Sequence, residues 1–133
     1  MILLDTTFLI DLLKKRKQAA DKADELADRD SLATTYVNFY ELMLGIYSLE
    51  DIDHDKKLRD AEILLDKLHV LKLDKHSAIR SAKIGGSLSL TGSIIGDTDN
   101  MIAGIALSNG INTIVTRDKE HFERIKELKV EGY

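Results

Sequence analysis

Four carboxylates in this 133-residue sequence are placed where they could act together on one substrate. Asp5 directly follows the apolar run MILL, and Asp118 comes shortly after a second β-rich run, NTIVT. Asp99 lies near the start of an apolar helical pattern, and Glu41 lies within a very apolar one. Two carboxylates about 5 Å apart repel by roughly 3 kcal/mol at an effective dielectric of about 20. A cluster of these acids therefore requires a counter-charge.

A hard divalent cation, Mg²⁺ or Mn²⁺, would remove this repulsion, because both ions prefer carboxylate and water oxygens. Such an ion with open coordination positions activates water and stabilises charge on a phosphate and its leaving oxygen. The acids therefore predict a metal site suited to phosphodiester hydrolysis. Asp97 is a neighbouring candidate ligand, but we assign Asp97 and Thr98 to capping a helix and Asp99 to the metal.

The elements that must position these acids follow from hydrophobic patterning. The run before Asp5 is typical of a strand buried on both faces of a parallel sheet, and we place it at the centre. Asp5 then lies at the carboxyl end of the strand, where open α/β sheets form ligand crevices. Further strands are expected at Ser31–Thr34, His69–Leu73, Asn112–Thr116 and Leu128–Val130.

Helices are expected between these strands, and the alternation predicts one α/β domain over residues 1–133 with both sheet faces covered. Thr6 or Thr7 is expected to cap the first helix. The expected later helices are Gln18–Asp28, Thr35–Leu49, Asp53–Leu68, Asp74–Leu90, Asp97–Asn109 and Asp118–Lys126.

Two of these helices carry specific predictions. Helix Thr35–Leu49 has so little polar surface that we expect burial on more than one side, with part of it available to a second subunit. Its polar or small positions form one narrow stripe: Asn38, Glu41, Gly45 and Ser48. Helix Asp74–Leu90 is expected to turn Ala78, Ile79, Ala82 and Gly85 or Gly86 inward, and to run into a loop within Ser87–Gly96.

Composition narrows the class of protein. The chain lacks cysteine, which excludes disulfides and thiolate metal sites. No apolar run approaches the roughly 20 residues needed to cross a membrane, and no signal peptide is evident, so we expect a cytoplasmic protein. The net charge of −4 argues against nucleic-acid binding by a basic surface alone. It is compatible with an enzyme that holds cations between itself and a phosphate backbone.

Four segments resemble the successive motifs of PIN-domain nucleases, with the order and spacing of VapC-type toxins from toxin–antitoxin pairs. They are MILLDTTFLIDLL, YELMLGI, IIGDTDNMIAGIALSNG and NTIVTRDKEHFERI, and the resemblance covers essentially the whole chain. It implies a three-layer α/β/α fold with a five-stranded parallel sheet in the order 3-2-1-4-5. Gly104 stands where the family usually has alanine, which should not affect the chemistry.

The resemblance also implies roles for individual residues and for partners. Asp5 and Asp99 would be the main ligands of Mg²⁺ or Mn²⁺, Glu41 a third acid and Asp118 a more peripheral one. Hydroxyl groups that support the pocket are implied at Thr7 and Thr116. The implied activity is endoribonucleolytic cleavage of single-stranded or loop RNA. The implied assembly is a homodimer with a small antitoxin protein that occludes the pocket, often with an arginine.

Alternatives remain at this point. A PIN-like RNA-processing or RNA-binding module could act mainly through partners, although four intact acids count against it. A receiver-like or phosphatase-like domain would need a lysine after a later strand, where this chain has Arg117 and Asp118. Arg117 itself is either a solvated surface residue or a substrate contact. The four histidines show no metal-binding spacing and are interpreted as structural: His54, His69, His76 and His121.

Overall fold

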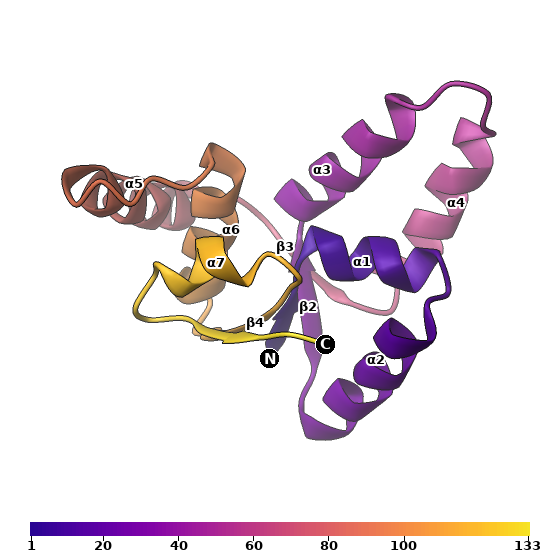
Figure 1. Ribbon diagram of the computed structural model, residues 1–133, viewed down its shortest axis with the longest axis horizontal. Helices are drawn as coiled ribbons and strands as arrows, with labels where there is room; N and C mark the ends of the chain where they lie inside the picture. The colour runs from indigo at the N-terminus through magenta and orange to yellow at the C-terminus, as the bar shows by residue number, and fades with distance from the viewer.

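A computed structural model describes residues 1–133, and its centre is a five-stranded parallel sheet in the order β3-β2-β1-β4-β5 (Figure 1). Each neighbouring pair of strands is parallel, and β1 lies in the middle. The strands are β1 (Ile2–Leu4), β2 (Leu32–Thr35), β3 (His69–Leu71), β4 (Thr113–Val115) and β5 (Lys129–Glu131). The predicted sheet, its order and its central first strand are confirmed.

Seven helices surround the sheet. They are α1 (Thr6–Leu13), α2 (Lys17–Arg29), α3 (Tyr36–Tyr47), α4 (His54–Leu65), α5 (Lys75–Leu90), α6 (Asp97–Ser108) and α7 (Lys119–Glu123). Helices α1 and α2 lie on one side of the sheet, and α5, α6 and α7 lie on the other (Figure 1). Helix α3 continues from β2 beyond the carboxyl ends of the strands, with α4 packed along it. None of the helices has the length and apolar character needed to span a membrane.

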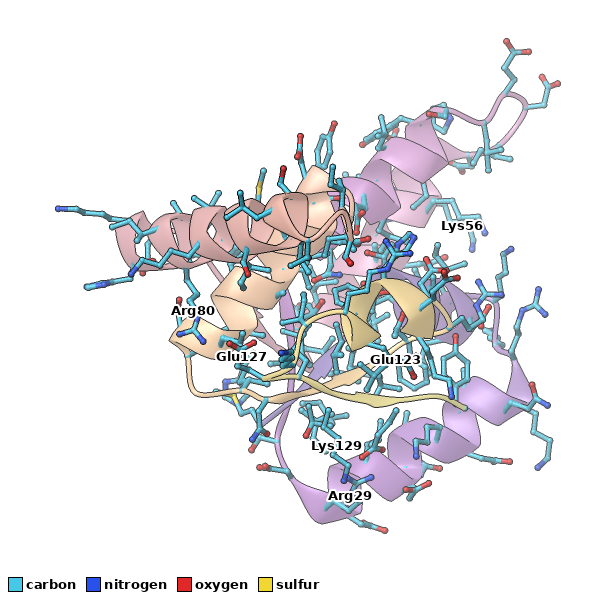
Figure 2. All side chains as sticks on the ribbon, turned by 60° about the vertical axis from the view of Figure 1, so that its left-hand side comes forward. Arg29, Lys56, Arg80, Glu123, Glu127 and Lys129 are labelled. Carbon is cyan, nitrogen blue, oxygen red and sulfur yellow. The ribbon has the colours of Figure 1, made fainter.

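The alternation of side chains along β1 divides the core into two layers. Ile2 and Leu4 pack with Phe8 and Leu9 of α1, whereas Leu3 packs with the cluster that α6 and α7 supply. This is the two-face burial that the apolar run predicted. Charged side chains such as Lys56 project outward (Figure 2).

The predicted caps of α1 and α6 are wrong. Helix α1 begins at Thr6 itself, with Asp5 at the N-cap position and no capping side-chain bond. Helix α6 begins at Asp97, with Gly96 at the N-cap position. The physical reason lies in tertiary contacts, because the hydroxyls of Thr6 and Thr98 bind a carboxylate from another helix. Three other helices do carry capping bonds, from Thr35, Asp53 and Asp74.

The inner face predicted for α5 is also wrong. Ala78, Ile79 and Ala82 are exposed, whereas the helix ends at Leu90 as expected and the predicted loop lies at residues 91–96. The buried residues lie on a different stripe: Ser77, Ser81, Ile84 and Leu88. Close helix contact explains the shift. A Cβ atom at Gly104 of α6 would lie 2.0 Å from the Ser81 hydroxyl and 2.7 Å from its backbone nitrogen, so only glycine fits.

Helix α3 is less buried than its composition suggested. Four large side chains on one stripe are about half exposed: Tyr36 (50%), Tyr40 (58%), Leu44 (53%) and Tyr47 (51%). The rest of α3 packs against α1, α4 and α6, so the expected burial on more than one side is confirmed and only this stripe is open. The suggestion that a second subunit covers part of this helix stays a prediction.

Candidate active site

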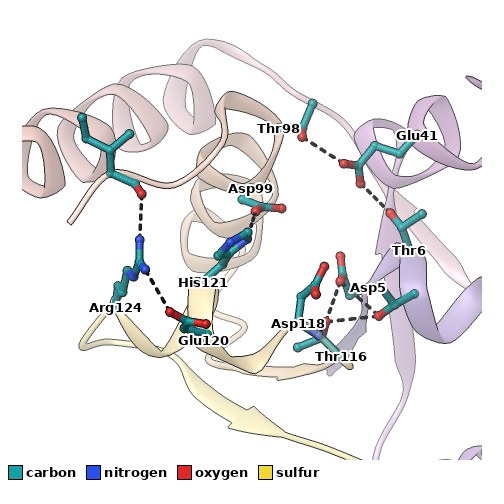
Figure 3. A network of polar contacts seen from close by, with 12 residues as sticks. Asp5, Thr6, Glu41, Thr98, Asp99, Thr116, Asp118, Glu120, His121 and Arg124 are labelled. Atoms are coloured by element: carbon teal, nitrogen blue, oxygen red, sulfur yellow. Dashed lines mark hydrogen bonds and ion pairs between the residues drawn. The ribbon is translucent and has the colours of Figure 1, made fainter.

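Asp5 is the buried acid of the candidate site, which lies at the carboxyl ends of the strands. It follows β1, and Thr116 follows the neighbouring β4, so parallel pairing brings the two residues together. The Thr116 hydroxyl donates to Asp5 Oδ2 at 2.6 Å (Figure 3). The amide of Asn38 donates to Oδ1 at 3.1 Å. Thr7 approaches Oδ2 at 3.4 Å. Asp5 retains only 4% exposure, so these contacts fix its carboxylate in place.

The electrostatics of Asp5 are unfavourable for a charged carboxylate. Burial raises its pKa to about 6, from an ordinary value of 3.8, although the Thr116 hydroxyl acts in the opposite direction. The charges of Glu41 and Asp99 raise the pKa further. The ion pairs of the chain leave Asp5, Glu41 and Asp118 without a basic partner. A cation from outside the chain would complement this charge.

Glu41 on α3 is held by hydroxyl groups from two other helices. Thr6 of α1 donates to Oε1 at 2.5 Å, and Thr98 of α6 donates to Oε2 at 2.9 Å (Figure 3). One turn before Glu41, Asn38 forms a capping box with Thr35 and also binds Asp5. Asn38 is a site residue that the sequence did not assign, although its shared stripe with Glu41 was the available signal.

Asp99 lies in the first turn of α6 and contacts His121 of α7. The distance from His121 Nδ1 to Asp99 Oδ2 is 2.9 Å. Burial raises the pKa of Asp99, the contact with His121 lowers it, and the charge of Asp118 raises it. The interpretation of His121 as purely structural therefore misses a contact in the site. The available signal was its spacing of three residues from Asp118, which places both on one side of a short helix.

Asp118 completes the group of predicted acids. Its backbone N–H donates to the Thr116 hydroxyl at 2.9 Å (Figure 3), and its charge raises the pKa of Asp99. It occupies the N-cap position of α7 but makes no capping side-chain bond. Asp97, by contrast, is exposed and borders a hollow of about 480 Å³ between α5 and α6, together with Asn100 and Met101. The structure thus separates Asp97 from the other four acids.

The donor set has the chemistry of a hard-cation site. Its ligating atoms are carboxylate oxygens, and the most buried of them has no positive partner. No three Asp, Glu or His side chains are gathered tightly enough to form a complete protein cage around an ion. Mg²⁺ commonly keeps several waters and uses one or two protein carboxylates, so this arrangement fits such an ion. The catalytic and metal-binding roles of the four acids stay predictions.

Similarity to known proteins shows the family of this chain. The chain matches the PIN domain over residues 2–128. The protein belongs to the PIN-domain family. Among curated PIN-domain relatives, ribonuclease VapC1 of Haemophilus influenzae (strain R2866) is 29% identical over 129 residues, covering 96% of this chain and 93% of that protein. The tRNA(fMet)-specific endonuclease VapC of Salmonella typhimurium is 31% identical over 134 residues, covering 98% and 96%.

Solved structures give the same result for the fold of this PIN domain. VapBC2 from Rickettsia felis, bound to a DNA fragment from its promoter, superposes with a TM-score of 0.88 at 23% identity, covering 100% of this chain and 99% of that one. DNA-bound VapBC from Salmonella typhimurium gives a TM-score of 0.84 at 28% identity, covering 99% and 98%. The predicted PIN-like α/β/α fold is confirmed.

Proposed function

We propose that this PIN domain is an Mg²⁺- or Mn²⁺-dependent endoribonuclease and the toxin of a toxin–antitoxin pair. One observation carries the proposal. Asp5, at the end of the central strand, is buried with a pKa raised to about 6 and lies in the field of two further acids. A protein that only needed stability would place a cation or an apolar side chain there. The names of the VapC relatives support RNA as the substrate.

Each side chain then has a specific task. Asp5 and Asp99 would hold the metal, with Glu41 as a third acid and Asp118 as a more peripheral one. When bound, the ion supplies an activated water and stabilises charge on the phosphate. Asn38 and Thr116 keep the Asp5 carboxylate in one orientation, as His121 does for Asp99. Such supporting contacts commonly change metal affinity or activity by about 10–100-fold.

Substitution of the acids tests this function. Asp5→Asn and Asp99→Asn should each lower Mn²⁺-dependent cleavage of RNA by at least about 100-fold, because losing a ligand exceeds the loss of a supporting contact. Asp97→Asn is the matched control, since Asp97 is an acid of the same helix turn that points elsewhere. We expect this control to cleave as the wild type does. If Asp5→Asn and Asp99→Asn cleave equally well, the activity is a contaminant and the proposal fails.

The similar solved structures also support a protein partner for this chain. The proteins from Rickettsia felis and Salmonella typhimurium were solved as VapBC assemblies, which supports an antitoxin as that partner. We also propose a homodimer, supported by the half-exposed stripe of Tyr36, Tyr40 and Leu44 on α3. The site of action would be the cytoplasm, where RNA is available. A module that binds RNA only through partners would have no use for carboxylates kept without basic partners.

A further inference from the structure

A second buried carboxylate, Asp11 of α1, lies outside the acid cluster. Asp11 is 3% exposed, and three side chains from separate segments contact it. Tyr133 donates from its hydroxyl to Oδ2 at 2.6 Å, Arg117 Nε lies 3.3 Å from Oδ2, and Arg16 Nε lies 3.1 Å from Oδ1. The mechanism proposed above uses none of these groups. This cluster therefore needs its own explanation.

The Asp11 cluster adjoins the candidate active site through Arg117. Arg117 precedes Asp118, and its backbone N–H donates at 3.0 Å to the Thr7 hydroxyl, which also approaches Asp5. Asp11 lies one turn after Thr7 on α1. The six residues from Asp5 to Asp11 span about 9 Å at the helical rise. The Arg117 side chain is thus held at the border of the site.

The guanidinium of Arg117 remains available to a ligand. The side chain is 50% exposed, and its one ion pair, with Asp11, involves Nε. Its two terminal nitrogens therefore remain as donors, and their planar geometry matches the oxygens of a phosphate. The neighbouring acids repel a polyanion, so a fixed positive charge at their border has a clear use.

We propose that Arg117 binds a backbone phosphate of the RNA close to the linkage that is cut, and that Asp11 is its positioning residue. The proposal rests on the proposed ribonuclease function. Asp11 limits the motion of the guanidinium, and the Tyr133 hydroxyl fixes Asp11 in turn. Arg16, whose side chain is 57% exposed, places a second arginine beside Asp11.

Cleavage kinetics at several KCl concentrations test this proposal, with a short single-stranded RNA and Mn²⁺. Arg117→Ala should raise KM about tenfold. It should also make the fall of log(kcat/KM) with log[KCl] less steep by about 0.7, which corresponds to one phosphate contact on a single strand. Arg117→Lys keeps the charge and should retain the wild-type slope, with only part of the KM restored. Arg80→Ala, which removes an arginine from α5 on the other side of the sheet, should change neither quantity.

Asp11 and Tyr133 are tested by variants that leave the charge of Arg117 in place. Asp11→Asn, and the milder Tyr133→Phe, should keep the salt slope and raise KM, because the guanidinium is present but less fixed. Urea unfolding of each variant measures any loss of stability separately. If Arg117→Ala is less stable but keeps the wild-type KM and slope, Arg117 is only a counter-ion and the inference is overturned. If the wild type does not cleave RNA, the proposed function fails and this inference fails with it.

Discussion

Two carboxylates of this PIN domain, Glu131 and Asp5, have opposite electrostatic surroundings. Glu131 on β5 receives both terminal nitrogens of Arg29, at 2.8 and 2.9 Å, with Lys22 at 3.4 Å, and its pKa falls to about 2. Asp5, which follows β1, receives only neutral donors and faces two further acids, and its pKa rises to about 6. One carboxylate is paired with cations inside the chain, and the other is kept from them.

This contrast separates a structural carboxylate from a candidate functional one. The chain has arginine and lysine side chains available and places them at Glu131 and Asp11. At Asp5 it uses Thr116 and Asn38, which orient the oxygens without neutralising them. The unfavourable electrostatics of Asp5 are then a property that an external cation removes. Perturbed acids of this kind concentrate at functional sites.

The largest expected effect on stability is at Asp5. Its folded-state pKa of about 6 lies above the ordinary 3.8, so the folded state binds the proton more tightly. Stability of the metal-free protein should therefore fall as the pH rises from about 4 through 6, by roughly 3 kcal/mol from this group. Asp5→Asn should remove this part of the pH dependence and be more stable than the wild type at pH 7. Urea unfolding at pH 5 and pH 7 measures both. A destabilised metal-free variant at pH 7 would mean that Asp5 is structural.

Binding of Mn²⁺ should offset the repulsion among the acids and stabilise the wild-type protein. An ion bound only by the folded state raises the free energy of unfolding by about 2.7 kcal/mol at 100 times its Kd. Thermal unfolding of the wild type should thus shift upward with millimolar Mn²⁺, whereas a double variant, Asp5→Asn with Asp99→Asn, should not respond. No shift for the wild type would favour the alternative module that acts through partners.

The smallest expected effect on stability is at Glu131, the carboxylate that is paired with Arg29. Glu131→Gln should destabilise the protein by about 1 kcal/mol, because the ion pair is close to solvent. Its contribution is present above the ordinary pKa of 4.5 and is lost as the pH falls toward about 2. RNA cleavage should stay at the wild-type level. Equal losses of cleavage from Glu131→Gln and Asp99→Asn would remove the distinction between the two regions.

The sequence was sufficient to predict the sheet, its order and its central strand. The roles of the four acids stay predictions. A strand buried on both faces is a continuous run of apolar residues. A charged residue directly after such a run marks the carboxyl end of the strand. The supporting groups were harder, because a threonine hydroxyl beside a helix start caps in isolation and binds elsewhere when a tertiary partner is near. Thr6 and Thr98, which both bind Glu41, are such cases.

Hydrophobic patterning also could not predict the close packing of α5 and α6 through small residues. Periodicity favoured Ile79 as an inward residue of α5, yet Ser81 takes the inner face because Gly104 lets α6 approach it closely. His121 was missed because its partner, Asp99, is distant in sequence. Contacts of this kind join segments that are distant in sequence, so they depend on the whole fold.

The most direct measurement is a crystal of the protein grown or soaked in Mn²⁺, with anomalous diffraction recorded at the manganese edge. We predict an anomalous peak coordinated by the carboxylates of Asp5 and Asp99, which disappears in Asp99→Asn crystals prepared in the same way. Well-defined carboxylates with no anomalous peak among them would contradict a metal-dependent nuclease site at this end of the sheet.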